Sequence, residues 1–333
     1  MLILTINKQK KGKVSMNNFK KIGLSALAGS LIAVSANAGS MSVTGSASLT
    51  FTNTDDESMA AEGNGWSMGD SLTFAGSGEM DNGMTIAVSY ELDGDAATSG
   101  NELDDHSMTL SSDAMGSITF AGHGGDGALS AIDDKTPNAM EESWDVVASA
   151  ETPPGGVSGE NMFTYTSPTM SGVTATVGYL NGSYTVTDVS YMDFAVEVQP
   201  EMVDGLTIGY GAADSEVVTG TQIDYTALYA TYAYGSVTVG YQINEADGPA
   251  SSDDIESEGF GITYAITDDL TVGYNQMEID QASSSEDQET SAIAASYTSG
   301  GVTLKGTLHN FDNVAYTAAN DGTAYELNVS FAF

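Results

Sequence analysis

The sequence predicts an all-β fold, a closed transmembrane barrel of about 16 antiparallel strands, and three observations predict it. Apolar and polar residues alternate along many short segments, which gives each segment one apolar and one polar face. Short and long connections between these segments alternate strictly along the chain. No stretch of 18 apolar residues follows Ala38, so the sequence offers no helix that could cross a bilayer.

The N-terminal residues indicate a targeting segment. A basic region at 17–21 precedes an apolar stretch at 22–34, and Ala36 and Ala38 form an A-x-A cleavage site. This pattern is typical of a secretory signal peptide, whose apolar part is too short to span a bilayer as a helix. Met16 suits the start of such a peptide. We therefore expect an upstream extension at 1–15, a signal peptide at 16–38 and one barrel domain at 39–333.

Each strand is predicted from its own alternation. Val237, Val239 and Tyr241, for example, alternate with Thr238 and Gly240. The same period of two recurs along the whole mature chain and ends in a strand whose last residue is aromatic. The sixteen predicted strands begin near Met41, Trp66, Met84, Asp105, Ser117, Asn161, Val173, Val189, Leu206, Ile223, Ser236, Ser257, Leu270, Glu289, Val302 and Thr323.

The connections between these strands are of two kinds. Turn-forming residues join some pairs tightly, as at Asp81-Asn82-Gly83 and Gly300-Gly301. Longer connections rich in Asp, Glu, Ser, Gly and Asn join the others, and the longest runs from His123 to Glu160. In a barrel this alternation places the tight turns at one rim and the long loops at the other.

A soluble sandwich or solenoid also contains alternating strands, and it would bury the apolar faces instead. Three features favour the membrane barrel: the regular asymmetry of the loops, the polar faces rich in Gly, Ser and Thr, and the terminal strand ending on Phe333. The first and last strands can then pair, which closes the sheet. Closure is required because an open edge would leave backbone groups unsatisfied in lipid.

The chain resembles the general porins of Gram-negative bacteria, most closely those of alphaproteobacteria. The resemblance rests on the signal peptide, the opening strand GSMSVTGSASLTF, the hairpin SITFAG-loop-NMFTYTSP and the terminal AYELNVSFAF, and it covers essentially the full mature chain. It implies an outer-membrane barrel of 16 strands, usually a homotrimer, that passes small hydrophilic solutes passively. It also implies that Phe333 is a signal to the barrel-assembly machinery.

The same resemblance implies that the long loop after the fifth strand folds into the barrel and narrows the pore. Independently, a connection of this length in a compact domain is usually functional or disordered, and a barrel of this size encloses an aqueous channel. A solvated surface loop without a role in the pore is the other interpretation. The candidate constriction residues are Asp126, Asp133, Asp134, Lys135, Glu141, Glu142 and Asp145.

The charge balance is strongly acidic. The chain has 46 acidic residues, eight lysines and no arginine, a formal charge of −38. Six lysines precede residue 22, so the mature chain keeps only Lys135 and Lys305 against all 46 acids, hence −44. This balance excludes a nucleic-acid binder. General porins of this kind oppose the acidic loop with basic wall residues, which are absent here. We expect a cation-preferring pore, with Lys305 facing the lumen or a rim.

The sequence also bears on metal binding and catalysis. With no cysteine there is no disulfide or thiolate metal site, and no catalytic or phosphate-binding motif points to an enzyme or a cofactor. Calcium or magnesium would suit acidic loops, which makes candidate cation sites of Asp55, Asp56, Glu57, Asp253 and Asp254. A solvated acidic rim is the simpler interpretation. Such a rim would share divalent ions with lipopolysaccharide phosphates in the outer-membrane lipid.

Two functions from other classes stay open. An acidic, calcium-binding adhesive β protein would share the strands and loops but form no channel. A barrel enzyme such as an outer-membrane phospholipase would need a catalytic Ser/His pair, and the three histidines, His106, His123 and His309, follow no catalytic or metal spacing.

Overall fold

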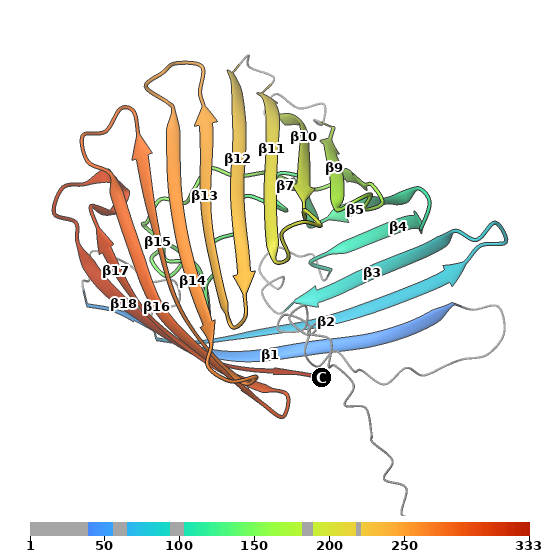
Figure 1. Cartoon of the computed structure of the whole chain (residues 1–333), viewed down its shortest axis with the longest axis horizontal. Helices are drawn as coiled ribbons and strands as arrows, with labels where there is room; N and C mark the ends of the chain where they lie inside the picture. The colour runs from blue at the N-terminus through green and yellow to red at the C-terminus, as the bar shows by residue number, and fades with distance from the viewer. Residues whose placement is uncertain (1–38, 56–64, 94–102, 182–188, 218–220) are drawn as a thin grey trace, which may run out of the picture.

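The computed structural model describes residues 39–55, 65–93, 103–181, 189–217 and 221–333. Figure 1 shows their strands curving into one barrel. The predicted targeting segment with Ala36 and Ala38, and the candidate cation ligands Asp56 and Glu57, lie outside the described residues.

The closed sheet runs in the order β1-β18-β17-β16-β15-β14-β13-β12-β11-β10-β9-β8-β5-β4-β3-β2, every pair antiparallel. This confirms the predicted 16-stranded barrel. Its strands are β1 (Ser40–Thr54), β2 (Gly65–Glu79), β3 (Thr85–Asp93), β4 (His106–Ser112), β5 (Gly116–His123), β8 (Met162–Thr166), β9 (Val173–Leu180), β10 (Val189–Val198), β11 (Leu206–Val217), β12 (Thr221–Tyr234), β13 (Val237–Asp247), β14 (Ile255–Ala265), β15 (Leu270–Gln281), β16 (Gln288–Ser299), β17 (Val302–Asp312) and β18 (Gly322–Ala332).

Two minor elements complete the fold. β6 (Gly125–Asp126) and β7 (Ser158–Gly159) form a separate two-stranded sheet, and Val314–Tyr316 forms a 3-10 turn between β17 and β18. No helix within the described ranges is long and apolar enough to cross a membrane.

The barrel closes through the two ends of the described chain. β1 pairs with β18 from Ser46, opposite Ala332, to Thr54, opposite Ala324. The ladder continues beyond β18: the Phe333 N–H donates to the Gly45 carbonyl at 2.9 Å, and the Gly45 N–H donates to the Phe333 carbonyl at 2.8 Å. The expected pairing of the end strands is therefore confirmed.

Each barrel strand begins within two residues of its predicted start. The largest differences are at β12, which begins at Thr221, and at β14, which begins at Ile255. At β14 the extra residues pair with β13, Ile255 with Ala246 and Glu256 with Glu245. The composition of the segments that precede these two strands predicted loops. Pairing with the neighbouring strands instead extends β12 and β14 into those segments.

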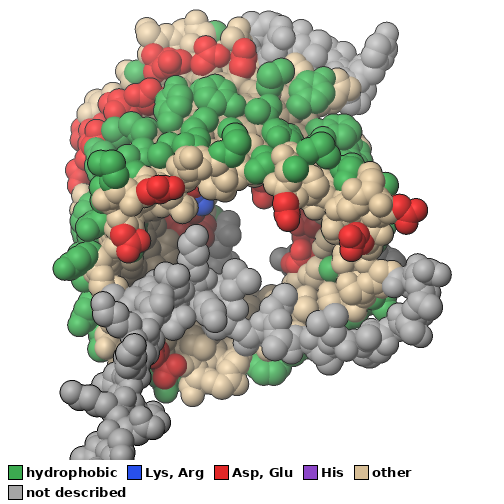
Figure 2. Space-filling view, turned by 45° about the vertical axis from the view of Figure 1, so that its right-hand side comes forward, with side chains coloured by type: hydrophobic (Ala, Val, Ile, Leu, Met, Phe, Trp, Pro, Cys, Tyr) green, Lys and Arg blue, Asp and Glu red, His purple; other side chains and the backbone are tan. Residues whose placement is uncertain are grey.

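The sheet has an apolar outer face and a polar inner face. On β13, Tyr241 is exposed outward while Gln242 and Asn244 are buried inward. The outward Tyr241 stands opposite Phe260, whereas Gln242 stands opposite Gly259. Figure 2 shows the resulting apolar outer band and an opening through the molecule. This distribution suits lipid outside and water inside.

Candidate functional site: a loop folded onto the inner wall

The connection between β5 and β8, residues 124–161, lies inside the barrel, and we call it the inner loop. Its backbone bonds to side chains on the inner faces of five strands: β10, β13, β15, β16 and β17. The pairing of Asp126 in β6 with Ser158 in β7 holds the two ends of the inner loop together at its base. The structure thus has the inward fold that the resemblance implies.

Two apolar clusters seat the inner loop at opposite ends of its path. Near the loop's beginning, Leu129 and Ile132 are fully buried against β8, β10, β11 and β12. Further along, Val146 and Val147 are buried against Phe311 of β17 and its neighbours. Full burial of such a side chain stabilises a fold by roughly 1.5–3 kcal/mol. The loop is therefore held along the inner wall from β8 to β18.

Between the two clusters, the loop approaches a part of the wall that has no side chains. A Cβ on Gly261 of β14 would stand 2.3 Å from the Pro137 carbonyl oxygen. A Cβ on Gly240 of β13 would stand 2.5 Å from Pro137 Cδ. Neither distance is tolerable for a real Cβ, so glycine at these positions is what lets the loop backbone reach the sheet.

Buried polar side chains bind the first half of the inner loop. Asp193 on β10 accepts a hydrogen bond from the Leu129 N–H at 2.7 Å. Gln242 on β13 donates to the Ile132 carbonyl at 3.1 Å and accepts from the Lys135 N–H at 2.5 Å. These bonds satisfy loop backbone groups that leave water when the loop meets the wall.

The second half is bound in the same way. Gln288 on β16 accepts from the Glu151 N–H and donates to the Glu151 carbonyl, both at 2.8 Å. His309 on β17 bonds through Nδ1 to the Ser143 carbonyl at 3.1 Å and through Nε2 to Glu141 Oε1 at 3.0 Å. The inner loop is thus a fixed part of the wall along its length.

Three carboxyl groups of the inner loop have raised pKa values. Burial raises the pKa of Asp133 to about 6, although the Gly156 N–H, which donates to its Oδ2 at 2.6 Å, acts in the opposite direction. Burial, and then the negative charge of Asp134, raise the pKa of Glu142 to about 7. The Asp134 residue is exposed, yet the protein around its carboxyl desolvates that group and raises its pKa. Asp134 and Glu142 share a hydrogen bond, so they titrate as a pair.

The other predicted constriction residues occupy several places. Asp126 is exposed in β6, and Asp145 is exposed beside the second apolar cluster. Lys135 lies within electrostatic reach of Asp133 and Asp134. Lys305 stands apart on the inner face of β17, opposite Ser296 and Asn328. The structure therefore brings Asp133, Asp134, Lys135 and Glu142 together and separates Lys305 from them.

The inner face of β1–β5 is lined mainly by hydroxyl side chains. Ser89 stands opposite Ser107, and Thr109 opposite Thr119, whose hydroxyls hydrogen-bond at 2.9 Å. Among the described residues, this part of the inner face carries Glu91, which stands opposite Thr73, and it carries no lysine or arginine. Within the described residues, the inner face of β1–β5 thus offers no cationic counterpart to the acidic loop.

A second acidic feature lies on the outer face, near the rim of long loops. Glu245 stands directly opposite Glu256, and Glu278 stands opposite both Glu258 and Glu289. We call these five residues the outer acidic band. Figure 2 shows acidic side chains along one rim beside the apolar band. Like charges directly opposite one another destabilise a sheet unless cations compensate them.

The loop residues predicted as cation ligands are partly engaged with backbone groups. Asp55 accepts the Thr323 N–H at 2.8 Å, and Asp254 accepts the Gly248 N–H at 3.1 Å. Asp253 accepts the Ser252 hydroxyl at 3.2 Å. Ion binding at these loops stays a prediction.

Another group of side chains of metal-ligand type, which the sequence did not suggest, lies where the inner loop begins. Asp104, Asp105 and His123 place ligand atoms within 4.8 Å of one another. Burial and the charges of Asp104 and Glu91 raise the pKa of Asp105. All three side chains are partly exposed, and the carboxylates surround a single imidazole.

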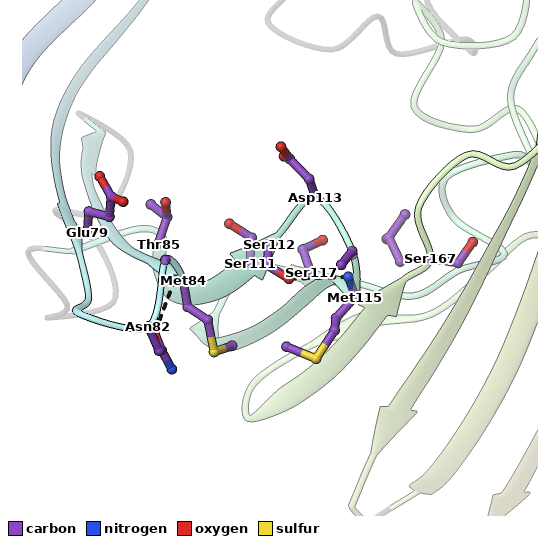
Figure 3. A pocket seen from close by; sticks show the side chains of 14 residues that line it. Glu79, Asn82, Met84, Thr85, Ser111, Ser112, Asp113, Met115, Ser117 and Ser167 are labelled. Carbon is purple, nitrogen blue, oxygen red and sulfur yellow. Dashed lines mark hydrogen bonds between the residues drawn. The ribbon is translucent and has the colours of Figure 1, made fainter.

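A separate hollow of about 780 Å³ lies among the short turns (Figure 3). Residues of three turn regions line it, including Glu79, Asn82, Asp113 and Ser167. The Met84 N–H donates to Asn82 Oδ1 at 3.1 Å, which is a bond within the turn itself. The hollow therefore belongs to the turn rim and collects no set of reactive groups.

Sequence reasoning did not single out the wall residues that bind the inner loop. Asp193, Gln242, Gln288 and His309 lie on inner faces otherwise rich in Gly, Ser and Thr. The sequence signal for these wall residues is a long polar side chain at an inward-facing position of a strand. The loop partner, however, lies far away in the sequence: Leu129 is 64 residues from Asp193, and Ser143 is 166 residues from His309. The alternation alone could not identify such a partner.

Comparison with known proteins gives a family model and similar structures. A model described as "Gram-negative porin" matches residues 23–313. An anion-selective porin from Comamonas acidovorans has a TM-score of 0.66 at 17% identity, covering 89% of this chain and 100% of that chain. The outer membrane protein OmpT of Vibrio cholerae has a TM-score of 0.65 at 10% identity, with 90% and 99% covered.

A mutant Rhodopseudomonas blastica porin has a TM-score of 0.61 at 17% identity, covering 88% of this chain and 100% of that chain. No curated protein matches the sequence. At these identities the similar structures show the barrel fold, while the family assignment rests on the family model.

Replacing Gly261 by alanine should displace the inner loop, because the new methyl group would meet the Pro137 carbonyl oxygen at 2.3 Å. Trypsin can report this, since Lys135 lies within the loop and Lys305 is the only other lysine after residue 21. We expect cleavage after Lys135 in the folded barrel to be about ten-fold faster than in the wild type.

The matched control is Gly76→Ala on β2, where the nearest atom to the new Cβ is Val88 Cγ2 at 3.5 Å. This variant should be cleaved at the wild-type rate. Equal cleavage of the two variants would show that the loop does not depend on the close approach at Gly261.

Proposed function

This chain belongs to the Gram-negative porin family, whose model matches residues 23–313, and from this premise we propose that its outer-membrane channel prefers cations. The porin family is a family of channels rather than enzymes, and passive diffusion of small hydrophilic solutes requires no reacting group. We infer that the inner loop sets both the free width and the charge of the channel.

The supporting observation is the one-sided charge of the lumen. Asp133, Asp134 and Glu142 gather on the inner loop with a single lysine, Lys135, near them. The hydroxyl-lined wall of β1–β5 adds no lysine or arginine within the described residues. Acidic groups concentrate cations in a narrow aqueous pore and repel anions. Anion selectivity is a property of the Comamonas acidovorans porin, and at 17% identity that protein shares the fold with this chain.

We also propose the partners that a porin of this kind requires. These are outer-membrane lipid and lipopolysaccharide, a barrel-assembly machinery that reads Phe333, export through a signal peptide at 16–38, and a homotrimeric state. The outer acidic band supports contact with lipopolysaccharide, because divalent ions can join its carboxylates to phosphate groups. The adhesive alternative would share such ion binding, and channel conductance distinguishes the two.

Reversal potentials in a planar bilayer under a salt gradient test the ion preference. The wild type should favour potassium over chloride. A variant that neutralises Asp133, Asp134, Glu141 and Glu142 to their amides should lose most of this preference, about a several-fold fall in the permeability ratio. Neutralising Glu201 and Asp204, which lie in the short connection between β10 and β11, is the control and should leave the ratio unchanged. An anion preference in the wild type would refute the proposal.

The ion preference should also depend on pH. The raised pKa values, about 6 for Asp133 and about 7 for Glu142, mean that these groups are protonated and neutral at low pH. As the pH rises through this window they ionise, so the potassium-to-chloride permeability ratio should rise. The Asp133→Asn, Glu142→Gln double variant should have a flatter profile over the same range. A ratio that falls with rising pH would contradict the assignment.

Chelation tests the contribution of divalent cations at the outer acidic band. In outer-membrane vesicles, removing calcium and magnesium should lower the melting temperature of the barrel, because the paired carboxylates then repel one another. Glu256→Gln with Glu278→Gln should make the barrel less sensitive to the chelator. A wild-type melting temperature that the chelator leaves unchanged would argue against bound divalent ions.

A further inference from the structure

His309 is a fully buried titratable group that passive diffusion itself does not use. It lies on the inner face of β17, between Ala292 of β16 and Ala324 of β18. Its ring stacks on Phe311, with 5.9 Å between ring centroids. Both of its nitrogens point at the inner loop, so it touches the second half of that loop from the wall.

The partners of the two nitrogens fix the number of protons. The Ser143 carbonyl, 3.1 Å from Nδ1, can only accept, so Nδ1 carries a hydrogen. Glu141 Oε1, 3.0 Å from Nε2, also accepts when the carboxylate is ionised. A neutral imidazole has one N–H and cannot donate to both. The observed contacts therefore require one extra proton shared by His309 and Glu141, either on Nε2 or on the carboxyl group.

The surroundings of this pair are acidic. From the inner loop, Glu141 faces the ring directly. From β18, Glu326 lies within electrostatic reach of His309, Glu141 and Asp145, and it accepts a hydrogen bond from Thr52 of β1. The neighbours on β16 and β18, Ala292 and Ala324, carry no charge, and Lys305 lies four residues away on the same strand.

This setting makes the shared proton important to the inner loop. Without it, the lone pair of Nε2 and a carboxylate oxygen, both acceptors, would face each other at 3.0 Å in a buried contact. The charges of Glu141 and Glu326 would also lose their nearest positive compensation. That repulsion would push Glu141, and with it the segment around Ser143 that Val146 and Val147 also hold, away from β17.

We propose that His309 is a positioning residue for the inner loop, and that the proton it shares with Glu141 keeps the second half of the loop against β16–β18. The loop is seated at pH values where the pair keeps this proton, and it loosens as rising pH removes it. The consequence for conduction rests on the proposed function, since a loosened loop changes the free width of the channel. The effect on the position of the loop does not rest on the proposed function.

Tryptophan fluorescence measures the loop position directly. The chain has two tryptophans: Trp144, next to Ser143 in the inner loop, and Trp66 on the outer face of β2. In a Trp66→Phe background, the emission and acrylamide quenching of Trp144 report on this segment alone. From about pH 5 to about pH 10, we expect a single step to longer wavelength, with about a two-fold rise in quenching.

Three variants locate the proton. In Glu141→Gln, the amide can donate to Nε2 of a neutral imidazole, so the loop should stay seated and the step should disappear. In His309→Gln, quenching should be high at every pH, again without a step. Glu142→Gln, the matched control one residue away, removes a carboxyl that bonds to Asn138 rather than to His309, and it should keep the step.

A wild-type signal without a step overturns the proposal, and so does a step that survives in both Glu141→Gln and His309→Gln. Conductance recorded over the same pH range separates the role of His309 in positioning the inner loop from the role of the inner loop in conduction. A fluorescence step accompanied by a conductance change supports both proposals. A fluorescence step at constant conductance supports the role of His309 and counts against control of the channel by the inner loop.

Discussion

Lipid offers no hydrogen-bond partner to a backbone N–H or C=O group, and the strands of this barrel satisfy that constraint by pairing on both sides. The rest of the structure depends on it. Closure requires the first and last strands to meet, which they do through β1, β18 and the Phe333 backbone. Closure also forces the residues of each strand to alternate between lipid and lumen, so one sequence pattern supplies both the apolar belt and the wet interior.

The same need to satisfy backbone groups explains why the inner wall carries residues that bind the inner loop. A wall lined only by small hydroxyl side chains would leave a wide lumen, and a loop crossing it would have no partner for its own backbone. Here the lumen receives the loop in two ways. Glycines such as Gly240 and Gly261 allow close approach, and buried polar side chains such as Asp193 and Gln288 replace the water that the loop backbone loses. The loop is thus positioned by the wall, and its acidic residues are positioned with it.

Much of this architecture could be predicted from the sequence, because period-two alternation and alternating connection lengths are local signals. They located every barrel strand to within two residues, as at β14, and identified the long loop after β5. The binding sites on the wall were not predictable in the same way. Gln242 meets Lys135 across 107 residues, and nothing near either residue encodes that meeting. The histidines show the limit most clearly, because His309 acquires its role only when the loop lies against it.

Closure through the final residues also has a kinetic consequence. The pairing of Ser46 with Ala332 joins positions nearly the whole barrel apart, and such non-local contacts form slowly because a long loop must close first. Until β18 pairs with it, β1 has no partner on its free side, so a chain in which β18 is missing or unfolded carries two unpaired strand edges. Closure of this barrel is therefore a late step of folding, and the unpaired edges of β1 and its partner strand stay open to aggregation until that step is complete.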